Sequence, residues 1–156
     1  MNLERVSSYA TPQARASTLH GPAHWRRVAS FGTQLSRETP GADAHVVAVF
    51  AALHDTQRYT DGRDPDHGRR AAGFALNLRG VLYKVEDEQM DVLVEAIAYH
   101  VDGLIHEDPT IGCCWDADRL DLPRCGIKID PTMLSTVAAR RRVAYFERKR
   151  KLTDDG

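Results

Sequence analysis

No stretch of this chain is apolar for long enough to cross a bilayer, and its polar N-terminus lacks the hydrophobic segment of a secretory signal. Cysteine is also scarce, because the 156 residues include only Cys113, Cys114 and Cys125. These residues form no C-x-x-C pair, and their odd number argues against a disulfide framework. We therefore expect a cytoplasmic protein whose cysteines serve as small packing residues.

The chain also lacks an excess of positive or negative charge. The formal net charge is -1 at pH 7, so the molecule as a whole has no field that attracts nucleic acid or an anionic membrane. We expect the basic segments 140–142 and 147–151 to form a solvated helix end, with a nucleic-acid contact as the less favoured alternative. An anionic ligand would have to be held by a local site.

Apolar residues recur mostly at helical spacing, and no segment reads convincingly as a strand. Capping residues, prolines and glycines predict helices at about 22–38, 44–53, 65–79, 86–99, 109–120 and 131–151. Residues 1–19 form either a short helix or a loose arm, and 122–129 an irregular connection. The expected fold class is all-α, a single-domain bundle of about six or seven helices over residues 1–156. Its core covers about 20–122 and its C-terminal helix about 131–151.

The most hydrophobic predicted helix ends in two ionisable residues. From Val46 to Leu53 it is apolar on nearly all sides, which predicts the central buried helix, and His54 and Asp55 follow directly. Burying an imidazole and a carboxylate is costly unless something pairs with them. A divalent cation meets that need, because imidazole supplies a neutral nitrogen ligand and the carboxylate supplies negative charge.

Two further segments carry ionisable side chains on separate predicted helices. His24 opens a segment that reads His-Trp-Arg-Arg-Val, and Asp118 lies in a segment that reads Asp-Ala-Asp-Arg-Leu-Asp. The order His, His-Asp, Asp resembles the HD-domain superfamily of metal-dependent phosphohydrolases, over about residues 20–122. The resemblance implies a helical bundle in which His24, His54, Asp55 and Asp118 bind a divalent metal ion.

The resemblance also implies roles for neighbouring residues. Asp118 matches the family's ligand better than Asp116, which leaves Asp116 either behind the ligands or on the helix surface. His67 opens one predicted helix and His100 closes another. In some members of the family, histidines in such places bind a second metal, and in others they contact the substrate phosphate.

Spacing along the chain adds two more candidates. His20 precedes His24 by one helical turn, so we expect it either behind the metal ligands or as a helix cap. Arg58 follows His54 by four residues and would share its helical face, where a guanidinium suits a phosphate oxygen. A solvated surface arginine is the alternative for Arg58.

The function that we favour from the sequence is hydrolysis of a phosphate ester of a small metabolite or nucleotide, with a metal-activated water as nucleophile. His67, His100 and Arg58 would then be the catalytic residues that act on the phosphate and the leaving group. The cofactor would be Mn, Co, Ni, Mg, Zn or Fe, with one ion or two. We expect a small-molecule phosphate as partner, without membrane or nucleic acid, and the oligomeric state stays open.

Two alternatives remain open at this point. Residues 24, 54, 55, 67, 100 and 118 also satisfy the ligand order of those HD-domain proteins that hold two irons and oxidise an organic substrate with dioxygen. The second alternative is a metal- or ligand-binding module that keeps the fold without turnover. The identity and number of bound metal ions would distinguish the oxygenase from the hydrolase.

Overall fold

The predicted central helix is α4, which spans Ala44–Leu53 in the structure, a computed structural model that describes residues 2–154. Seven of its ten residues are buried. Asp43 caps it as predicted, because its carboxylate accepts the backbone N–H groups of His45 and Val46. The local sequence thus decides where α4 begins, and its hydrophobicity decides that it lies inside.

Helices make up nearly all the regular structure of residues 2–154, where no β-strand forms and a single isolated bridge joins Arg79 and Tyr83. The elements in chain order are α1 (Leu3–Tyr9), α2 (Pro12–Ala16), α3 (Pro22–Glu38), α4, α5 (His67–Leu78), α6 (Asp87–Tyr99), α7 (Pro109–Arg119), the 3-10 turns η1 (Leu122–Cys125) and η2 (Pro131–Met133), and α8 (Val137–Asp154). The predicted all-α class is confirmed, and the N-terminal stretch adds two short helices. Within the same residues, no helix combines the length and hydrophobicity needed to span a membrane.

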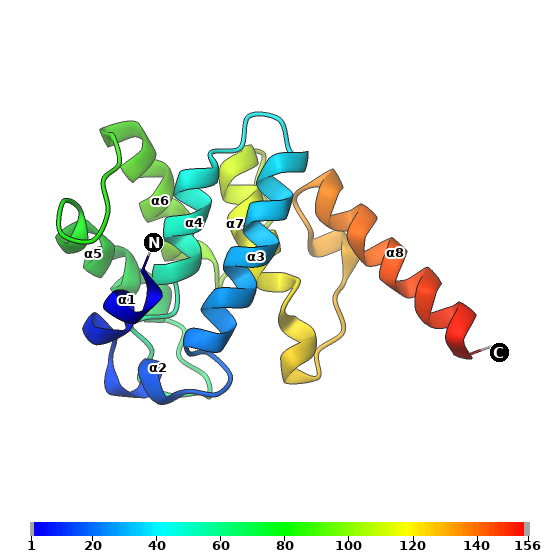
Figure 1. Cartoon of the computed structure of the whole chain (residues 1–156), viewed down its shortest axis with the longest axis horizontal. Helices are drawn as coiled ribbons and strands as arrows, with labels where there is room; N and C mark the ends of the chain where they lie inside the picture. The colour runs from blue at the N-terminus through cyan, green and yellow to red at the C-terminus, as the bar shows by residue number, and fades with distance from the viewer. Residues whose placement is uncertain (1, 155–156) are drawn as a thin grey trace.

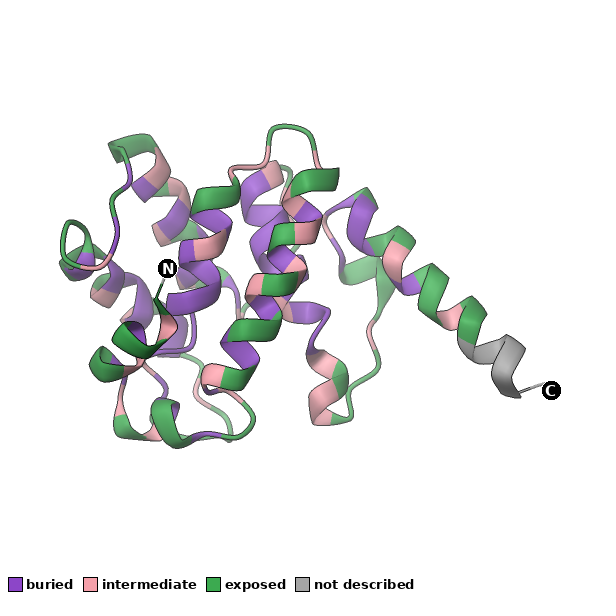
Figure 2. Ribbon diagram, in the orientation of Figure 1, coloured by how far each residue is buried: buried purple, intermediate pink, exposed green. Residues whose placement is uncertain are grey.

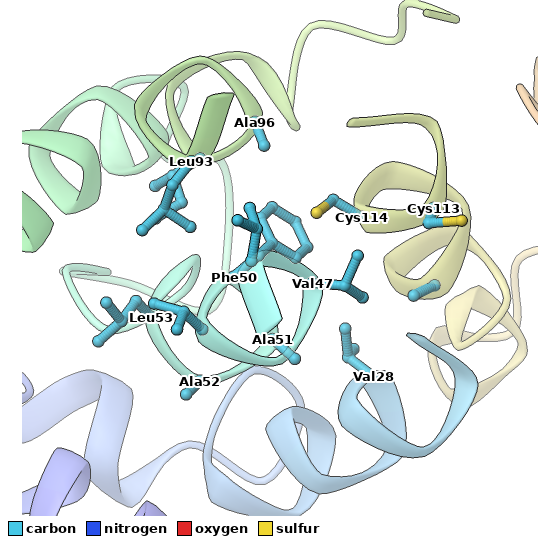
Figure 3. Packing of buried hydrophobic residues seen from close by; sticks show 14 of the residues in the cluster. Val28, Val47, Phe50, Ala51, Ala52, Leu53, Leu93, Ala96, Cys113 and Cys114 are labelled. Atoms are coloured by element: carbon cyan, nitrogen blue, oxygen red, sulfur yellow. The ribbon is translucent and has the colours of Figure 1, made fainter. Parts of the chain in front are cut away.

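The core forms where α3, α6 and α7 surround α4 (Figure 1). Figure 3 shows Phe50 of α4 pointing between Leu93 of α6 and Cys114 of α7, and Val47 pointing toward Val28 of α3. All five side chains are buried. Burial of a side chain such as Phe50 or Leu93 stabilises the fold by about 1.5–3 kcal/mol. This packing fixes the C-terminal end of α4, where His54 and Asp55 lie.

The cysteines behave as the sequence predicts. Cys113 and Cys114 are buried in the core, Cys125 is half-buried, and none of the three forms a disulfide. Burial raises the pKa of the Cys114 thiol well above its ordinary value and also raises that of Cys113. Both side chains therefore stay protonated and pack as small apolar groups.

The start of the C-terminal helix differs from the prediction. The sequence favours a helix start at Asp130-Pro131, but the structure forms only the turn η2 there, and α8 begins at Val137. The backbone N–H groups of Ser135 and Thr136 both donate to the buried carboxylate of Asp116 on α7. This contact holds the chain extended before α8, so the helix cannot continue back to residue 131.

Most of the residues of α8 up to position 149, where the structure describes side chains, are exposed. The helix projects away from the bundle toward the C-terminus (Figure 1), and Figure 2 shows much of its described surface as exposed. Arg140 and Arg141 are both exposed, whereas Ala139 and Val143 pack against the body. Its first half therefore anchors the helix, and the basic segment at 140–142 lies largely in solvent.

Candidate metal centre

The C-terminal end of α4 meets the ends of four other helices. His54 is the C-cap residue of α4, and Asp55 follows it directly. The other candidate ligands lie at helix ends, with His24 in the first turn of α3, His67 at the start of α5, His100 directly after α6 and Asp118 in the last turn of α7. All of these side chains are buried except that of Asp118, which is 21% exposed. The fold therefore brings together the six residues whose order the sequence singles out.

The first group of candidate ligands surrounds Nε2 of His24. This atom lies 3.1 Å from Nε2 of His54 and 3.2 Å from Oδ1 of Asp118. Oδ2 of Asp55 lies 3.6 Å from the same His24 atom and 3.8 Å from Nε2 of His54. Four side chains from α3, α7 and the end of α4 thus direct nitrogen or oxygen atoms into one small space.

A second group lies on the other side of the Asp55 carboxylate. Oδ1 of Asp55 is 2.8 Å from Nε2 of His67 and 3.6 Å from Nε2 of His100. The two ring nitrogens are 3.0 Å from each other. Asp55 therefore connects the two groups, with Oδ2 facing the first and Oδ1 facing the second.

Gly68 makes the approach of α5 to α6 possible. A Cβ atom at this position would lie 2.8 Å from the carbonyl oxygen of Ile97 and 2.9 Å from that of Ala98. It would also lie 3.2 Å from Nδ1 of His100. Because backbone atoms cannot move aside cheaply, only glycine allows His67 and His100 to meet at this distance.

The Nδ1 atoms of the four histidines all face hydrogen-bond acceptors. The pairs are His24 with the Asp121 carboxylate at 2.7 Å, His54 with Phe50 O at 3.3 Å, His67 with Asp64 O at 2.5 Å and His100 with Ile97 O at 2.7 Å. A carbonyl or carboxylate oxygen only accepts, so each Nδ1 carries a proton. In the neutral ring, Nε2 then has a lone pair. Lone pairs that face each other at about 3 Å repel unless a proton or a cation lies between them.

Burial dominates the ionisation of His54 and lowers its pKa to about 3, so this ring is neutral at pH 7. Burial alone would also lower the pKa of His24. Its hydrogen bonds to Asp118 and Asp121 outweigh that effect and raise the pKa above the ordinary value. The central ring of the site is therefore uncharged and could serve as a neutral nitrogen ligand.

The carboxylates of the site stay ionised. Burial would raise the pKa of Asp55, but its interactions with His54 and its hydrogen bond with His100 hold the pKa well below the ordinary value. Burial opposes the ionisation of Asp118 too, and the hydrogen bond with His24 outweighs it and lowers the pKa. The same interaction affects His100. Burial alone would lower the pKa of His100, but its hydrogen bond to Asp55 outweighs burial and raises that pKa. The site thus offers negative charge to a cation at neutral pH.

Arg58 is buried beside the site. Its Nη1 lies 3.1 Å from Nε2 of His67 and 3.5 Å from Oδ1 of Asp55. Its Nε and Nη2 donate to the carbonyl oxygens of Thr60 and Gly62. The alternative of a solvated surface arginine is therefore wrong, and this guanidinium ties the loop after Asp55 to the second group of ligands.

His20 lies directly behind Asp55. Its Nδ1 is 3.1 Å from Oδ2 of Asp55 and 3.3 Å from Nη2 of Arg124. His20 precedes Gly21, the N-cap residue of α3, so it does not share a continuous helix with His24. The structure places it at the back of a candidate ligand, one of the two positions expected for it.

Asp116 does not belong to the site, and the prediction for this residue is wrong. It is fully buried rather than on the helix surface. Its carboxylate accepts the N–H groups of Ser135 at 2.8 Å and Thr136 at 2.7 Å, and also the Thr136 hydroxyl at 2.8 Å. Residues two apart on a helix point in nearly opposite directions, so Asp116 faces the start of α8 while Asp118 faces the other candidate metal ligands.

Asp121 is a site residue that the sequence patterns did not reveal. It is 6% exposed, and Oδ2 lies 2.7 Å from Nδ1 of His24. Burial would raise its pKa, but the hydrogen bonds from His24 and from Nε of Arg27 hold the pKa below the ordinary value. The three-residue spacing from Asp118 could have indicated it, since such residues lie on neighbouring parts of a helix surface.

Two sets of three residues in the described part of the chain have the geometry for a metal ion. One ligand atom from each of His24, His54 and Asp118 lies within 4.8 Å of the others, and the same holds for His54, Asp55 and His100. Imidazole and carboxylate together suit divalent transition metals. Comparisons of the chain with protein-family models, with curated proteins and with solved structures found no match.

Proposed function

We propose that this protein is a metal-dependent phosphohydrolase that acts on a small phosphorylated metabolite or nucleotide. The observation that carries the proposal is the convergence of four histidine Nε2 atoms on the carboxylate of Asp55, each with its Nδ1 hydrogen-bonded to an acceptor. Without a metal ion, a proton must lie between neighbouring rings, and the raised pKa values of His24 and His100 agree with that. With a cation, the same arrangement becomes a set of oriented ligands.

The spacing of the first group fits a divalent ion. Metal–ligand bonds of about 2.1 Å place neighbouring ligand atoms about 3.0 Å apart in octahedral and about 3.4 Å apart in tetrahedral coordination. Five distances among the ligand atoms of His24, His54, Asp55 and Asp118 lie between 3.1 and 3.8 Å. These four residues would hold the ion, which we expect to be Mn, Co, Ni, Mg, Zn or Fe.

The charge of the site explains why a phosphate substrate would require the metal. Asp55 and Asp118 are ionised and would repel an anion, and Asp118 lies on the solvent-accessible side of the site. A bound divalent ion supplies a Lewis acid for a phosphoryl oxygen and lowers the pKa of a bound water. We therefore expect the substrate to approach past Asp118 and to bind only to the metal-loaded protein.

The second group of residues supplies the remaining chemistry. His100 has a raised pKa because its hydrogen bond to Asp55 outweighs burial, so it can hold a proton at Nε2 and donate it to the leaving oxygen. His67 lies 3.0 Å from His100 and can accept or pass on that proton. Arg58 keeps His67 and Asp55 in place and adds positive charge next to the phosphate position.

A two-iron oxygenase is the second candidate function. The observation in its favour is that His54, Asp55 and His100 form another set of potential ligands, and that His67 lies 2.8 Å from Asp55. Because His54 has only one free ring nitrogen, a second ion beside the first would be held by Asp55, His67 and His100. In that case His67 and His100 would be ligands rather than acid–base groups.

The test begins with the metal content of protein purified without chelator. We expect one divalent ion per chain, and hydrolysis of at least one compound from a panel of phosphorylated metabolites and nucleotides with added Mn, Co, Ni, Mg or Zn. An Asp55→Ala variant should lose both the metal and the activity, because Asp55 contacts both groups of ligands. Asp87→Asn is the control, since the Asp87 side chain is 92% exposed and forms an ion pair with Arg79, outside both groups.

The outcomes separate the alternatives. An Asp55→Ala protein that kept its full metal content and activity would contradict the proposal. Two irons per chain together with substrate-dependent consumption of dioxygen would favour the oxygenase. A bound metal with no turnover of any compound in the panel would favour a binding module that has kept the fold.

A further inference from the structure

Asp121 occupies a helix-capping position without capping the helix. It is the N-cap residue of η1, yet its side chain accepts no hydrogen bond from the backbone of that turn. In contrast, the carboxylates of Asp43, Asp108 and Asp130 all accept backbone N–H groups at the starts of their helices. The carboxylate of Asp121 is therefore available for another partner.

That partner is the buried ring of His24. Oδ2 of Asp121 lies 2.7 Å from Nδ1 of His24, and both residues are almost inaccessible to solvent, at 6% and 0% exposed. The residues are 97 positions apart, so only the packing of α3 against the end of α7 brings them together. A hydrogen bond this short to a charged acceptor is strong in such a buried place.

Two arginines hold the Asp121 carboxylate in its orientation. Nε of Arg27 donates to Oδ1 at 2.8 Å and to Oδ2 at 3.0 Å. Nε of Arg124 lies 3.6 Å from Oδ2, and Nη1 of Arg124 donates to the backbone carbonyl oxygen of Asp121. Because guanidinium groups can only donate, they keep Asp121 ionised and leave it only the role of acceptor toward His24.

We propose that Asp121 is a positioning residue that keeps the proton of His24 on Nδ1 and directs the Nε2 lone pair into the metal centre. The proposal rests on the proposed metal centre and adds the residue that prepares its His24 ligand. A carboxylate behind a ligating histidine fixes the tautomer and the ring orientation and makes the ring a better donor to the metal. Arg27 acts indirectly, because its hydrogen bonds fix the orientation of the Asp121 carboxylate.

An Asp121→Asn variant tests this role with almost no change in side-chain size. Nε of Arg27 lies closer to Oδ1 than to Oδ2, and an amide nitrogen cannot accept its hydrogen bond, so we expect the amide oxygen to take the Oδ1 position. The amide nitrogen would then face Nδ1 of His24 and donate to it. The His24 proton would be forced onto Nε2, which removes the lone pair that points into the site.

The experiment measures Zn²⁺ affinity by competition with a chelator. It also records, for the Zn²⁺-loaded protein, the NMR spectrum that correlates each histidine ring nitrogen with its attached proton. We expect Asp121→Asn to weaken Zn²⁺ binding by about 10- to 100-fold. We also expect the wild-type spectrum to contain a low-field, slowly exchanging Nδ1 proton of His24, and the variant to lose it. Asp87→Asn, at an exposed site, should match the wild type in both measurements.

An Arg27→Leu variant separates the role of the carboxylate from that of the ion pair. Arg27 is 43% exposed, and its removal leaves the Asp121 carboxylate beside His24. We expect this variant to keep the Nδ1 proton and to bind Zn²⁺ more tightly than Asp121→Asn. An equal loss of affinity in both variants would show that the ion pair alone matters, which would overturn the proposal.

Other outcomes are equally decisive. Unchanged Zn²⁺ affinity in Asp121→Asn would overturn the inference while leaving the metal centre intact. A wild-type protein that binds none of Mn²⁺, Co²⁺, Ni²⁺, Mg²⁺, Zn²⁺ and Fe²⁺ would instead refute the proposed function on which the inference rests. Should Asp121→Asn fail to fold, the wild-type spectrum decides, since a His24 ring without a hydrogen-bonded Nδ1 proton contradicts the assigned role.

Discussion

Oδ1 of Asp55 lies 2.8 Å from Nε2 of His67, while Oδ2 of the same carboxylate faces His24 and His20. One short, buried side chain therefore connects all the histidines of the candidate site. Because the two oxygens face different groups, removing His67 should affect only one side of Asp55. This separation allows ligands and acid–base groups to be tested independently.

A His67→Asn variant should keep the metal and lose turnover. The first group of ligands does not include His67, so we expect the metal content to stay at one ion per chain. Loss of an acid–base group beside the phosphate should lower kcat by about a hundredfold or more. Metal analysis and steady-state kinetics on the same preparation check this, and a fall from two ions to one would instead identify His67 as a ligand.

Gly68→Ala should disturb the site through the backbone. The added methyl group would press on the carbonyl oxygens of Ile97 and Ala98, so α5 must move away from α6. We expect a loss of about 1–3 kcal/mol in the free energy of unfolding, measured with denaturant, and a matching loss of activity.

Gly73→Ala is the matched control for that substitution, since Gly73 lies on the same helix and a Cβ there would meet nothing within 4 Å. This change should stabilise the protein by about 0.5–1 kcal/mol, because alanine is the better helix former. Equal effects of the two substitutions would mean that the close approach at Gly68 does not position His67.

Asp116→Asn should destabilise the fold without changing metal binding. The Asp116 carboxylate accepts three hydrogen bonds from Ser135 and Thr136 in a buried place, and an amide offers only one accepting oxygen. We expect a loss of about 2–3 kcal/mol in the free energy of unfolding. Asp130→Asn, which alters only the exposed cap of η2, should cost much less. Loss of metal from folded Asp116→Asn protein would contradict this assignment.

The histidines of the metal-free protein should titrate in an unusual order. His54 has a folded pKa of about 3, so its ring should show no protonation between about pH 5 and pH 8. His24 and His100 have raised pKa values and should become protonated above pH 6.5 as the pH falls. Ring-resolved NMR of metal-free protein checks this, and protonation of His54 near neutral pH would contradict it.

The same shifts predict how stability depends on pH. Because the pKa of His54 is lower in the folded state, the unfolded chain binds the extra proton between pH 6.5 and about 3, and His54 lowers stability as the pH falls through that range. His24 and His100 act in the opposite direction. Their stabilising effect is complete below pH 6.5 and is lost as the pH rises through their folded pKa values. The free energies of unfolding of the metal-free wild type and of metal-free His54→Asn, taken from unfolding curves, should therefore diverge as the pH is lowered from 6.5.

The sequence by itself determined most of the helices and the order of the ionisable residues. Local signals such as Asp43 and Asp108 before apolar segments act within one turn, so the starts of α4 and α7 follow from neighbouring residues. The burial of His54 and Asp55 follows from the hydrophobicity of α4. Binding of a metal by these residues stays a prediction.

Only the tertiary structure decided which carboxylate faces which partner. Asp116 and Asp121 lie five positions apart around the end of α7, yet one accepts hydrogen bonds from the chain just before α8 and the other accepts one from His24. Sequence spacing gives the angle between two side chains on a helix, but the rotation of the helix in the bundle sets what each one meets. The start of α8 depends on both kinds of contact, because Thr136 caps the helix locally while Asp116 of α7 holds the preceding residues. Contacts between residues far apart in the chain depend on how the helices pack, so they cannot be predicted from the neighbouring residues in the sequence.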